Sequence, residues 1–534
     1  MKKHIPFLIA ISLVAVALFG PACRTANDAD ARHDAAPPEP QEVQIKETKL
    51  PPLTGLKWVL PEKYARLEGD KLIVDIPASD YPADAMAEAE LPASLCAGAK
   101  GFSIAVSAEG TDLAKPTKTY LGLKFQIHVV DKSTGLERWP NCPKELGSFA
   151  KELRNDASFG GLRPDSVTLQ LGLQGTSGRV VFDLSTLRGG PTTGLFRVIN
   201  QDWIVHYPES VKNLPPLHGF MSPQRAMTED DIETMHGWGA TLIRFQICRN
   251  WSGNDDNQDL EEYAAWVDSR LDNLEDVLRW ADARGMKVVI DVHVPPGGKR
   301  AKDREMNMLH NDVFAEAWID TWRRIATRFK GKPAIYGYDL INEPHQNGRA
   351  KNDYWTLQRR AAEAIRAIDP DTPIVFASNL ANAPSAFEYL SPLRMDNVIY
   401  EIHVYAPTDF THQGIQGRPA GLKWPDPEKN WNKEHLRARL APVRAFEARH
   451  HAKIYVGEFS AITWAEGAEN YLRDCIELFE EYGWDWTYHA FRESNIWSIE
   501  HEIPAPGQKS VPSADNPRKR VILKGLTHTK EKKQ

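Results

Sequence analysis

The spacing of hydrophobic residues divides the chain into parts with different expected folds. Between residues 55 and 190, hydrophobic and polar positions alternate in short runs such as Lys71–Ile76 and Val167–Leu171, with Gly, Pro, Asp and Ser between the runs. Alternation with a period of two is typical of strands with one buried face, and several such strands separated by turn residues predict an all-β sandwich. In this part a helix is expected only at residues 143–154.

From residue 206 to 505 the pattern changes to strands that alternate with amphipathic helices. Val288–Val292 is nearly all apolar, as expected for a parallel strand covered on both faces. The helix that follows carries Phe314, Trp318 and Trp322 at spacings of four, which puts them on one face. Eight such strands in about 300 residues predict a (β/α)8 TIM barrel. The strands are expected near residues 217–220, 241–247, 287–294, 335–342, 373–379, 398–405, 453–460 and 484–491.

Residues 1–23 have the composition of a signal peptide. Lys2 and Lys3 precede an apolar run that ends at Phe19, and small residues stand before Cys23. This order predicts export, so we expect an extracellular, periplasmic or outer-membrane-anchored protein of a bacterium. Cys23 resembles the lipid-modified cysteine of bacterial lipoproteins, and the sequence leaves open whether it carries a lipid anchor.

The segments that flank the two expected domains are polar. Residues 24–54 are rich in Asp, Ala, Pro, Glu and Lys and contain few large apolar residues, which predicts a flexible linker. Residues 506–534 are polar and basic and are expected to form a tail, in which Arg518–Gly525 could complete the last barrel helix.

Charge and cysteine content narrow the range of partners. A formal net charge of −7 and an isoelectric point near 6.2 argue against a nucleic-acid partner, which usually needs a basic surface. An uncharged polysaccharide fits better, and some of the sixteen tryptophans could form platforms on which sugar rings stack. Cys96 and Cys142 could form a disulfide after export, while Cys248 and Cys475 are expected to be buried free thiols. No cysteine spacing indicates a metal site; we expect a monomer without metal or cofactor.

Two predicted barrel strands end in a glutamate. The stretch at 338–344 reads Tyr-Asp-Leu-Ile-Asn-Glu-Pro and contains Glu343, and the stretch at 454–459 reads Ile-Tyr-Val-Gly-Glu-Phe and contains Glu458. A buried strand rarely carries an unpaired carboxylate, because removing that charge from water is costly. The carboxyl ends of barrel strands meet at one rim, so both glutamates are expected in one site. A pair of carboxylates is the minimum machinery for cleaving a glycosidic bond.

Other polar residues are expected at the same rim, because they also stand at the ends of predicted strands. Any one of them alone would be an ordinary core or ion-paired residue, whereas the set around two carboxylates predicts a catalytic site. A metal-dependent hydrolase is disfavoured, since the two histidines stand on strands three and six without an obvious third ligand. The residues are Arg244 on the second strand, His293 on the third, Asn342 on the fourth, and His403 and Tyr405 on the sixth.

Together these motifs resemble glycoside hydrolase family 5, a family of cellulase-like barrels. The resemblance covers residues 206–505 and rests on Asn342-Glu343-Pro344, His403-x-Tyr405 and Gly457-Glu458-Phe459, with Arg244 and His293 in addition. It implies retaining hydrolysis of a β-linked polysaccharide, with Glu343 as general acid and base and Glu458 as nucleophile. It further implies that Asn342 holds the sugar's 2-hydroxyl group, that Tyr405 hydrogen-bonds the nucleophile, that Arg244 lowers the nucleophile's pKa, and that His293 and His403 shape the subsite of the reacting sugar.

The chain departs from that family at the end of the eighth strand, where the family usually has a tryptophan below the reacting sugar. His489 stands at that place, and Trp497 could supply the aromatic surface instead. In the N-terminal part, the strand Arg179–Leu184 resembles the last strand of jelly-roll carbohydrate-binding modules. The sandwich is therefore either sugar-binding or purely structural.

The function predicted from these observations is that of an endo-β-1,4-glucanase. The same scaffold leaves open a β-mannanase, a xyloglucan-active enzyme or an exo-β-glucosidase and, from another class, a non-catalytic glycan-binding surface protein. The two roles also predict opposite pKa shifts. Arg244 and the phenol of Tyr405 should keep Glu458 ionised, and the acid Glu343 should hold its proton through a raised pKa.

Overall fold

The computed structural model describes most of the chain beyond residue 49. The described residues are 50–96, 99–108, 113–116, 121–131, 136–138, 149–158, 166–191, 200–249, 251, 257–300, 305–346 and 350–531. The predicted signal peptide, Cys23, the linker up to residue 49 and Cys142 lie outside them. Cys96 is a half-buried free thiol, so the disulfide with Cys142 that the sequence allowed is not formed. Cys248 and Cys475 are buried free thiols, as predicted.

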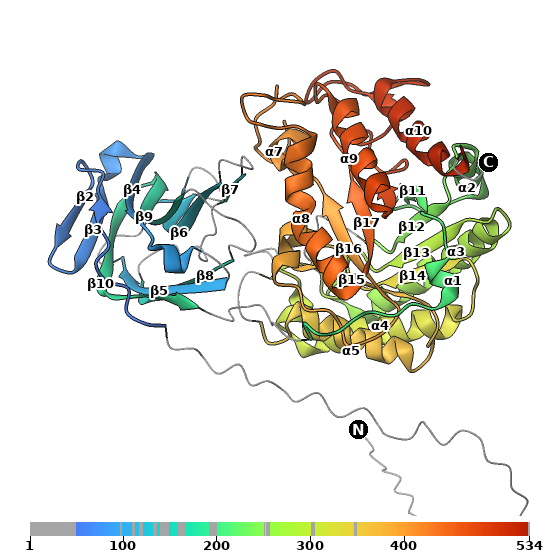
Figure 1. Cartoon of the computed structure of the whole chain (residues 1–534), viewed down its shortest axis with the longest axis horizontal. Helices are drawn as coiled ribbons and strands as arrows, with labels where there is room; N and C mark the ends of the chain where they lie inside the picture. The colour runs from blue at the N-terminus through green and yellow to red at the C-terminus, as the bar shows by residue number, and fades with distance from the viewer. Residues whose placement is uncertain are drawn as a thin grey trace, which may run out of the picture. The chain divides into compact units, whose positions relative to one another are not determined.

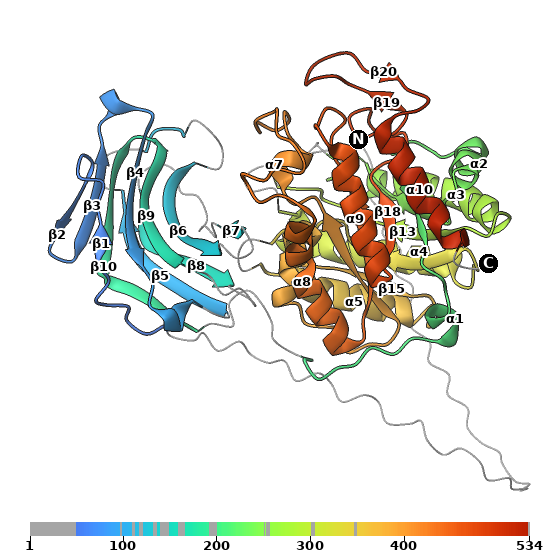
Figure 2. The ribbon, with the colours of Figure 1, turned by 45° about the horizontal axis from the view of Figure 1, so that its top comes forward.

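The N-terminal part is built from two antiparallel sheets, and the predicted β-sandwich is confirmed (Figures 1 and 2). The strand orders are β1-β4-β9-β6-β7 and β2-β3-β10-β5-β8. Alternate residues of each strand point inward, so that Phe125, Leu171 and Phe182 meet in a hydrophobic core of their own. The strands are β1 (Trp58–Val59), β2 (Ala65–Glu68), β3 (Lys71–Ile76), β4 (Ala83–Glu90), β5 (Ala99–Ser107), β6 (Gly122–Asp131), β7 (Leu136–Arg138), β8 (Ala150–Ser158), β9 (Ser166–Thr176) and β10 (Gly178–Pro191).

Two segments of this part differ from the expectation. The described end of the predicted helix 143–154 belongs to strand β8, because Leu153 and Asn155 both point inward and the Asn155 amide donates to the Phe125 carbonyl over 2.8 Å. The end of the predicted linker also packs on the sandwich. Leu53 is buried in its core, and the Leu53 amide donates to the Leu187 carbonyl over 3.0 Å.

The C-terminal part contains a closed barrel of eight parallel strands, and the predicted TIM barrel is confirmed. Each strand pairs with the next one, and β18 pairs with β11 to close the ring. Trp318 and Trp322 of α4 are fully buried against the strands, as their spacing predicted. The strands are β11 (His218–Met221), β12 (Leu242–Gln246), β13 (Lys287–Asp291), β14 (Ile335–Asp339), β15 (Ile374–Ala377), β16 (Val398–Val404), β17 (Lys453–Phe459) and β18 (Asp485–Tyr488).

Helices surround the barrel strands in both ribbon views (Figures 1 and 2). Their apolar faces and the strands share one large hydrophobic core. The helices are α1 (Glu209–Lys212), α2 (Glu229–Gly237), α3 (Leu260–Asp282), α4 (Asp312–Phe329), α5 (Tyr354–Arg366), α6 (Asn379–Asn382), α7 (Thr408–Thr411), α8 (Lys433–His450) and α9 (Ala468–Tyr482).

The segment after residue 505, expected to be a tail, packs on the barrel. A short hairpin of β19 (His501–Glu502) and β20 (Val511–Pro512) leads to helix α10 (Pro517–Glu531), which extends beyond the predicted Arg518–Gly525. Ile522 and Leu526 lie one turn apart on α10 and are buried in the barrel's core. Proline is well suited to the first turn of a helix, because its missing N–H has no partner there in any case.

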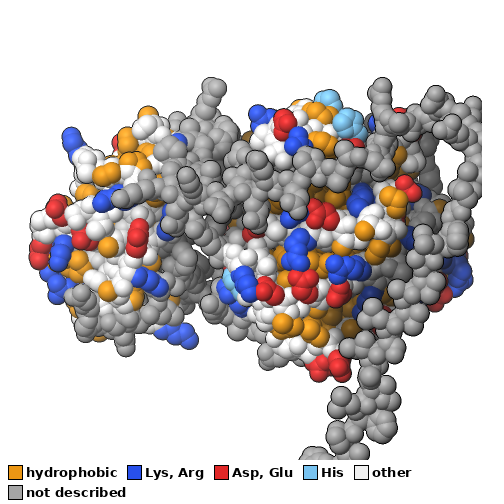
Figure 3. Space-filling model, turned by 90° about the horizontal axis from the view of Figure 1, so that it is seen from below, with side chains coloured by type: hydrophobic (Ala, Val, Ile, Leu, Met, Phe, Trp, Pro, Cys, Tyr) orange, Lys and Arg blue, Asp and Glu red, His pale blue; other side chains and the backbone are white. Residues whose placement is uncertain are grey.

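The surface carries charges of both signs. On the face drawn in Figure 3, the coloured Lys and Arg side chains lie among Asp and Glu side chains. Ion pairs account for some of this mixing: on the outside of the barrel, Arg328 lies 2.7 Å from Asp272 and 2.9 Å from Glu275. Within the described residues, no helix is both long enough and apolar enough to span a bilayer.

Candidate active site

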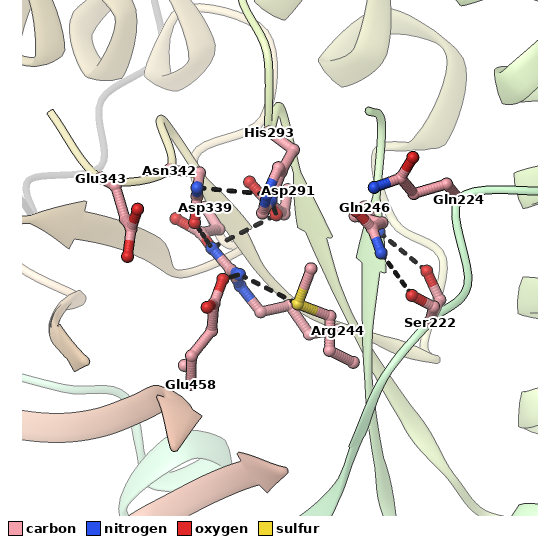
Figure 4. Close-up of polar contacts among 12 residues, drawn as sticks. Ser222, Gln224, Arg244, Gln246, Asp291, His293, Asp339, Asn342, Glu343 and Glu458 are labelled. Carbon is pink, nitrogen blue, oxygen red and sulfur yellow. Dashed lines mark hydrogen bonds and ion pairs between the residues drawn. The ribbon is translucent and has the colours of Figure 1, made fainter. Parts of the chain in front are cut away.

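The barrel brings the predicted site residues together at the C-terminal ends of its strands. Arg244 lies on β12, His403 on β16 and Glu458 on β17, and the other residues follow the ends of β13, β14, β16 and β18. Figure 4 shows Arg244, Asn342 and Glu458 in one connected group, with Glu343 beside it. This arrangement follows from topology, because all strands of a parallel barrel end at the same rim.

Glu458 is held as a buried, ionised carboxylate. Arg244 Nη1 donates to Glu458 Oε1 over 2.8 Å, and the Tyr405 hydroxyl donates to Oε2 over 2.8 Å. Burial raises the pKa of Glu458, but the charges of His403, His489 and Arg244 lower it by more. The resulting pKa is well below the ordinary value of a glutamate. A carboxylate with two fixed donors and a depressed pKa suits the role of a nucleophile.

Glu343 faces the same space from the end of β14. Its side chain is 22% exposed, and His403 Nδ1 lies 3.0 Å from Glu343 Oε1. The backbone of Glu343 has a φ of 50°, a left-handed conformation that is uncommon for a residue with a side chain. Such conformations cost about 1–3 kcal/mol and cluster at functional sites, where the surrounding structure enforces them.

Glu343 and His403 share a proton. The sequence predicted that Glu343 would hold it, but in the structure His403 does. Burial and the charge of Glu458 raise the pKa of Glu343, but the hydrogen bond from His403 and the charges of His403 and Lys299 together outweigh them, and the pKa falls below its ordinary value. Burial lowers the pKa of His403, whereas Glu458, Glu343 and Glu401 raise it to about 10. The prediction of a raised pKa for Glu343 is therefore wrong for the free protein, because an imidazolium stands between the two carboxylates.

The spacing of the two carboxylates is short. One oxygen of Glu343, one oxygen of Glu458 and a ring nitrogen of His403 all lie within 4.8 Å of one another. Retaining glycosidases hold their carboxyl groups about 5–5.5 Å apart, whereas inverting enzymes need about 6.5–9.5 Å to admit a water. The same three groups could surround a metal ion, which would have to displace the proton that the raised pKa of His403 keeps on its ring.

A chain of hydrogen bonds fixes the orientation of Asn342 and His293. Arg244 can only donate, so Asn342 Oδ1, which lies 3.1 Å from Arg244 Nη2, is the acceptor. Asn342 Nδ2 must then donate to His293 Nε2 over 3.2 Å. His293 carries its hydrogen on Nδ1, which lies 2.7 Å from Asp291 Oδ2. Asn342 thus stands between Arg244 and His293 in one defined orientation (Figure 4).

Three buried carboxyl side chains form ion pairs with Arg244. Sequence reasoning missed all three. Asp291, Asp339 and Glu401 are fully buried and lie 3.2, 2.8 and 3.3 Å from Arg244 Nη2. Burial and the charge of Glu401 raise the pKa of Asp339 well above its ordinary value, by more than the charge of Arg244 lowers it. A signal was present in the sequence, since each of the three interrupts an otherwise apolar strand.

The residues that follow β18 form an aromatic group beside Tyr405, whose hydroxyl donates to Glu458. Trp497 packs against His412, His489 and Tyr405, with ring centroids 5.0, 5.6 and 6.4 Å away. Trp497 belongs to the hydrophobic core of the barrel part, and only 7% of it is exposed. His489 lies nearer the rim, where its Nε2 is 3.2 Å from Glu493 Oε2. Whether either residue contacts sugar stays a prediction.

Trp251, which sequence reasoning did not single out, adds a second aromatic surface near the site. Its ring lies 5.0 Å from that of His293, and Lys299 Nζ stands 3.4 Å from the centroid of the Trp251 ring. The ammonium group faces the ring as in a cation–π pair. Trp251 therefore borders the site on the side of His293.

Comparison with known proteins places the barrel among polysaccharide-degrading enzymes. The family described as Cellulase (glycosyl hydrolase family 5) matches residues 206–495. Endoglucanase C of Acetivibrio thermocellus is 26% identical over 295 residues, which cover 49% of this chain and 84% of that protein. Cellodextrinase A of Ruminococcus flavefaciens is 25% identical over 264 residues, which cover 48% of this chain and 75% of that protein. A solved structure of Thermotoga maritima Cel5A in complex with cellobiose is 21% identical with a TM-score of 0.46, covering 58% of this chain and 96% of that one.

Proposed function

We propose that this chain, which belongs to glycosyl hydrolase family 5, is an endo-acting glucanase that cleaves β-1,4 bonds with retention of configuration. The observation that carries the stereochemistry is the approach of Glu343 and Glu458 oxygens to within 4.8 Å, which suits direct attack by one carboxylate and leaves no room for a water between them. The substrate rests on family membership and on the endoglucanase and cellodextrinase among its relatives.

In the first step, Glu458 attacks the anomeric carbon and Glu343 protonates the departing glycosidic oxygen. Arg244 and Tyr405 hold Glu458 in place and keep it ionised. The pair of Glu343 and His403 supplies the single proton: it moves from His403 Nδ1 across the 3.0 Å contact to Glu343 and then to the leaving group. After this step Glu343 is a carboxylate and His403 is neutral.

In the second step, a water molecule hydrolyses the glycosyl ester of Glu458. Glu343 takes a proton from the water, the hydroxide attacks the anomeric carbon, and Glu458 leaves as a carboxylate. Because the ester carries no charge, the repulsion that Glu458 exerted on Glu343 is absent, and Glu343 is suited to act as a base. With the proton taken from water, the pair of Glu343 and His403 again holds one proton, as it did before the first step.

Two measurements test this proposal. Proton NMR of the first products should show the β-anomer before mutarotation, and an initial α-anomer would contradict retention. Product analysis on β-1,4-glucan, mannan and xyloglucan should show internal cleavage of the glucan. Preferred cleavage of mannan or xyloglucan would keep the chemistry and change the substrate, and release of glucose alone from chain ends would indicate an exo-β-glucosidase.

We also propose that residues 1–23 direct export and that the mature protein is a monomer, attached to a membrane if Cys23 is lipidated. The positively charged start, the apolar run and the small residues before Cys23 support this proposal. Mass spectrometry of the mature N-terminus should show cleavage before Cys23 and the mass of a lipid, and Cys23→Ala should release the protein into solution. An N-terminus that retains residues 1–22 would contradict export by this route.

A further inference from the structure

A carboxylate that the proposed reaction does not use follows the last barrel strand, in contact with His489. Glu493 follows β18, and its side chain is 15% exposed. His489 Nε2 lies 3.2 Å from Glu493 Oε2, and Gln246 donates to the same oxygen over 3.3 Å. Gln224 donates to Glu493 Oε1 over 3.1 Å. Gln246 ends β12 and Gln224 follows β11, so Glu493 connects three neighbouring strand ends; both glutamines are seen in Figure 4.

This group is close enough to the reacting centre to influence it. The ring of His489 lies 6.2 Å from that of Tyr405, whose hydroxyl donates to Glu458. Burial and Glu458 raise the pKa of Tyr405, and Glu493 adds to that shift. Glu493 therefore lies in the electrostatic surroundings of the nucleophile.

A third ionised carboxylate at this place is costly. Burial raises the pKa of Glu493, but the charge of His489 and the hydrogen bond from its ring lower it below its ordinary value, so the group is ionised. Like charges close together oppose one another's ionisation, and a buried ion pair seldom adds net stability. Perturbed charged groups that folding stability does not explain are concentrated at functional sites.

Glu493 can accept one more hydrogen bond. A carboxylate offers about four acceptor positions, and His489, Gln246 and Gln224 take three of them within the described part of the chain. The remaining position belongs to Oε1, on the side of the exposed residue Gln224. Trp497, by contrast, is largely covered by its aromatic neighbours. A sugar at this end of the site thus meets a charged acceptor and little open aromatic surface.

We propose that Glu493 is a substrate-binding residue that accepts a hydrogen bond from one hydroxyl group of the sugar lying over Glu458. His489, Gln246 and Gln224 are positioning residues that hold the carboxylate. The inference rests on the proposed function, since it needs a glucan chain in this site. A site that hydrogen-bonds a substrate hydroxyl rejects analogues that lack it far more strongly than an apolar surface does, so Glu493 would make the enzyme select its substrate by hydroxyl pattern.

The test combines protein variants with altered substrates. The substrates are 2,4-dinitrophenyl β-cellobioside and its analogues in which the reacting glucose lacks the 2-, 3- or 6-hydroxyl group. We compare kcat/KM for the parent enzyme, Glu493→Ala and Glu493→Gln. Glu500→Ala is the matched control, because Glu500 lies on the same loop with a side chain 23% exposed but pairs with Arg492, 2.9 Å away. Thermal unfolding of each variant checks that it is folded.

For one of the three hydroxyl groups, its removal from the substrate should lower kcat/KM of the parent enzyme by at least about 100-fold. In Glu493→Ala, removal of the same hydroxyl group should lower kcat/KM by less than about 5-fold. Glu493→Gln, which keeps the shape, should give an intermediate penalty, and Glu500→Ala should leave it unchanged. The assignment of Glu493 would be overturned, and the proposed function kept, if the parent is active but the loss on removing each hydroxyl group is the same in Glu493→Ala. The same holds if Glu500→Ala reduces that loss as much as Glu493→Ala does. A parent inactive on the unmodified cellobioside and on β-1,4-glucan would overturn the proposed function and the assignment with it.

Discussion

Replacement of His403 by asparagine should move the alkaline limit of activity to lower pH. In the proposed reaction, the first step consumes one proton that His403 and Glu343 share across a contact of 3.0 Å. That proton is lost only as the pH approaches the raised pKa of His403, about 10. Asparagine keeps a polar group of similar reach beside Glu343 but cannot hold the proton.

The size of the shift follows from where the proton can go in the variant. Without His403, the proton can reside only on Glu343, where burial and the charge of Glu458 raise the pKa and the opposing hydrogen bond is gone. Enzymes that use a buried glutamic acid as a general acid tune its pKa to roughly 6–7. Against a value of about 10 for His403, the alkaline limb of kcat/KM should fall by about 3 pH units. The sign is downward because a carboxyl group releases its proton at lower pH than this imidazolium does.

The assay is a profile of kcat/KM on soluble β-glucan from about pH 4 to about pH 11, with the thermal unfolding temperature measured at each pH. The matched control is His450→Asn, since His450 is also buried but its ring lies away from both carboxylates, with Nδ1 2.8 Å from the Trp203 carbonyl oxygen as its hydrogen-bond partner among the described residues. The control should keep the parent's alkaline limb. Identical limbs for His403→Asn and the parent, both folded, would refute the idea that the two groups share the catalytic proton.

Three further predictions concern the nucleophile, its neighbour and the N-terminal part. Glu458→Gln should lower kcat by at least about 1,000-fold and leave calorimetric binding of cellotetraose largely intact, because it removes the nucleophile and keeps its size; activity above about 1% would place the nucleophile elsewhere. Gly457→Ala should destabilise the protein by more than about 3 kcal/mol in urea unfolding, because a Cβ there would overlap the buried Glu401 carboxylate. Gly237→Ala, with open space around it, should change stability by no more than about 1 kcal/mol, and equal losses for the two variants would contradict the overlap. A fragment of residues 50–191 should unfold cooperatively with a β-type circular dichroism spectrum, because its core is a separate hydrophobic cluster; a gradual melt would mean that the barrel completes that core.

Much of the site could be located before the structure was known, because strand ends in a barrel share one rim. Glu343 and Glu458 lie 115 positions apart in the sequence, yet both follow apolar strand patterns, and topology alone brings them together. Asp291, Asp339 and Glu401 were missed, although each is a charge within an apolar strand, because their common partner Arg244 comes from another strand. The partner of a buried charge is set by how far a side chain extends across the barrel. The spacing of hydrophobic residues along the sequence does not contain that information.

Other features left no usable pattern in the sequence. Glu493 stands in a polar segment after β18 and reads as an ordinary surface residue until His489, Gln246 and Gln224 are seen to converge on it. The predicted helix at 143–154 was wrong in its described part because the inward alternation of Leu153 and Asn155 spans too few residues to oppose a helical reading. Helix α10 was underestimated because charged and polar residues surround its few apolar ones, of which Ile522 and Leu526 are buried and Val521 and Leu523 pack against the core.

The sequence by itself determined the fold class, the two carboxylates and the family, because periodicity, strand-end glutamates and short motifs are local properties of the chain. Only the tertiary structure decided where the protons lie. The pKa of Glu343 was expected to be raised by burial, and it is lowered because His403, from a strand 60 positions away, stands 3.0 Å from its carboxylate. Electrostatic energies depend on distances of a few ångströms and on the loss of solvent around each charge, and the fold alone sets both.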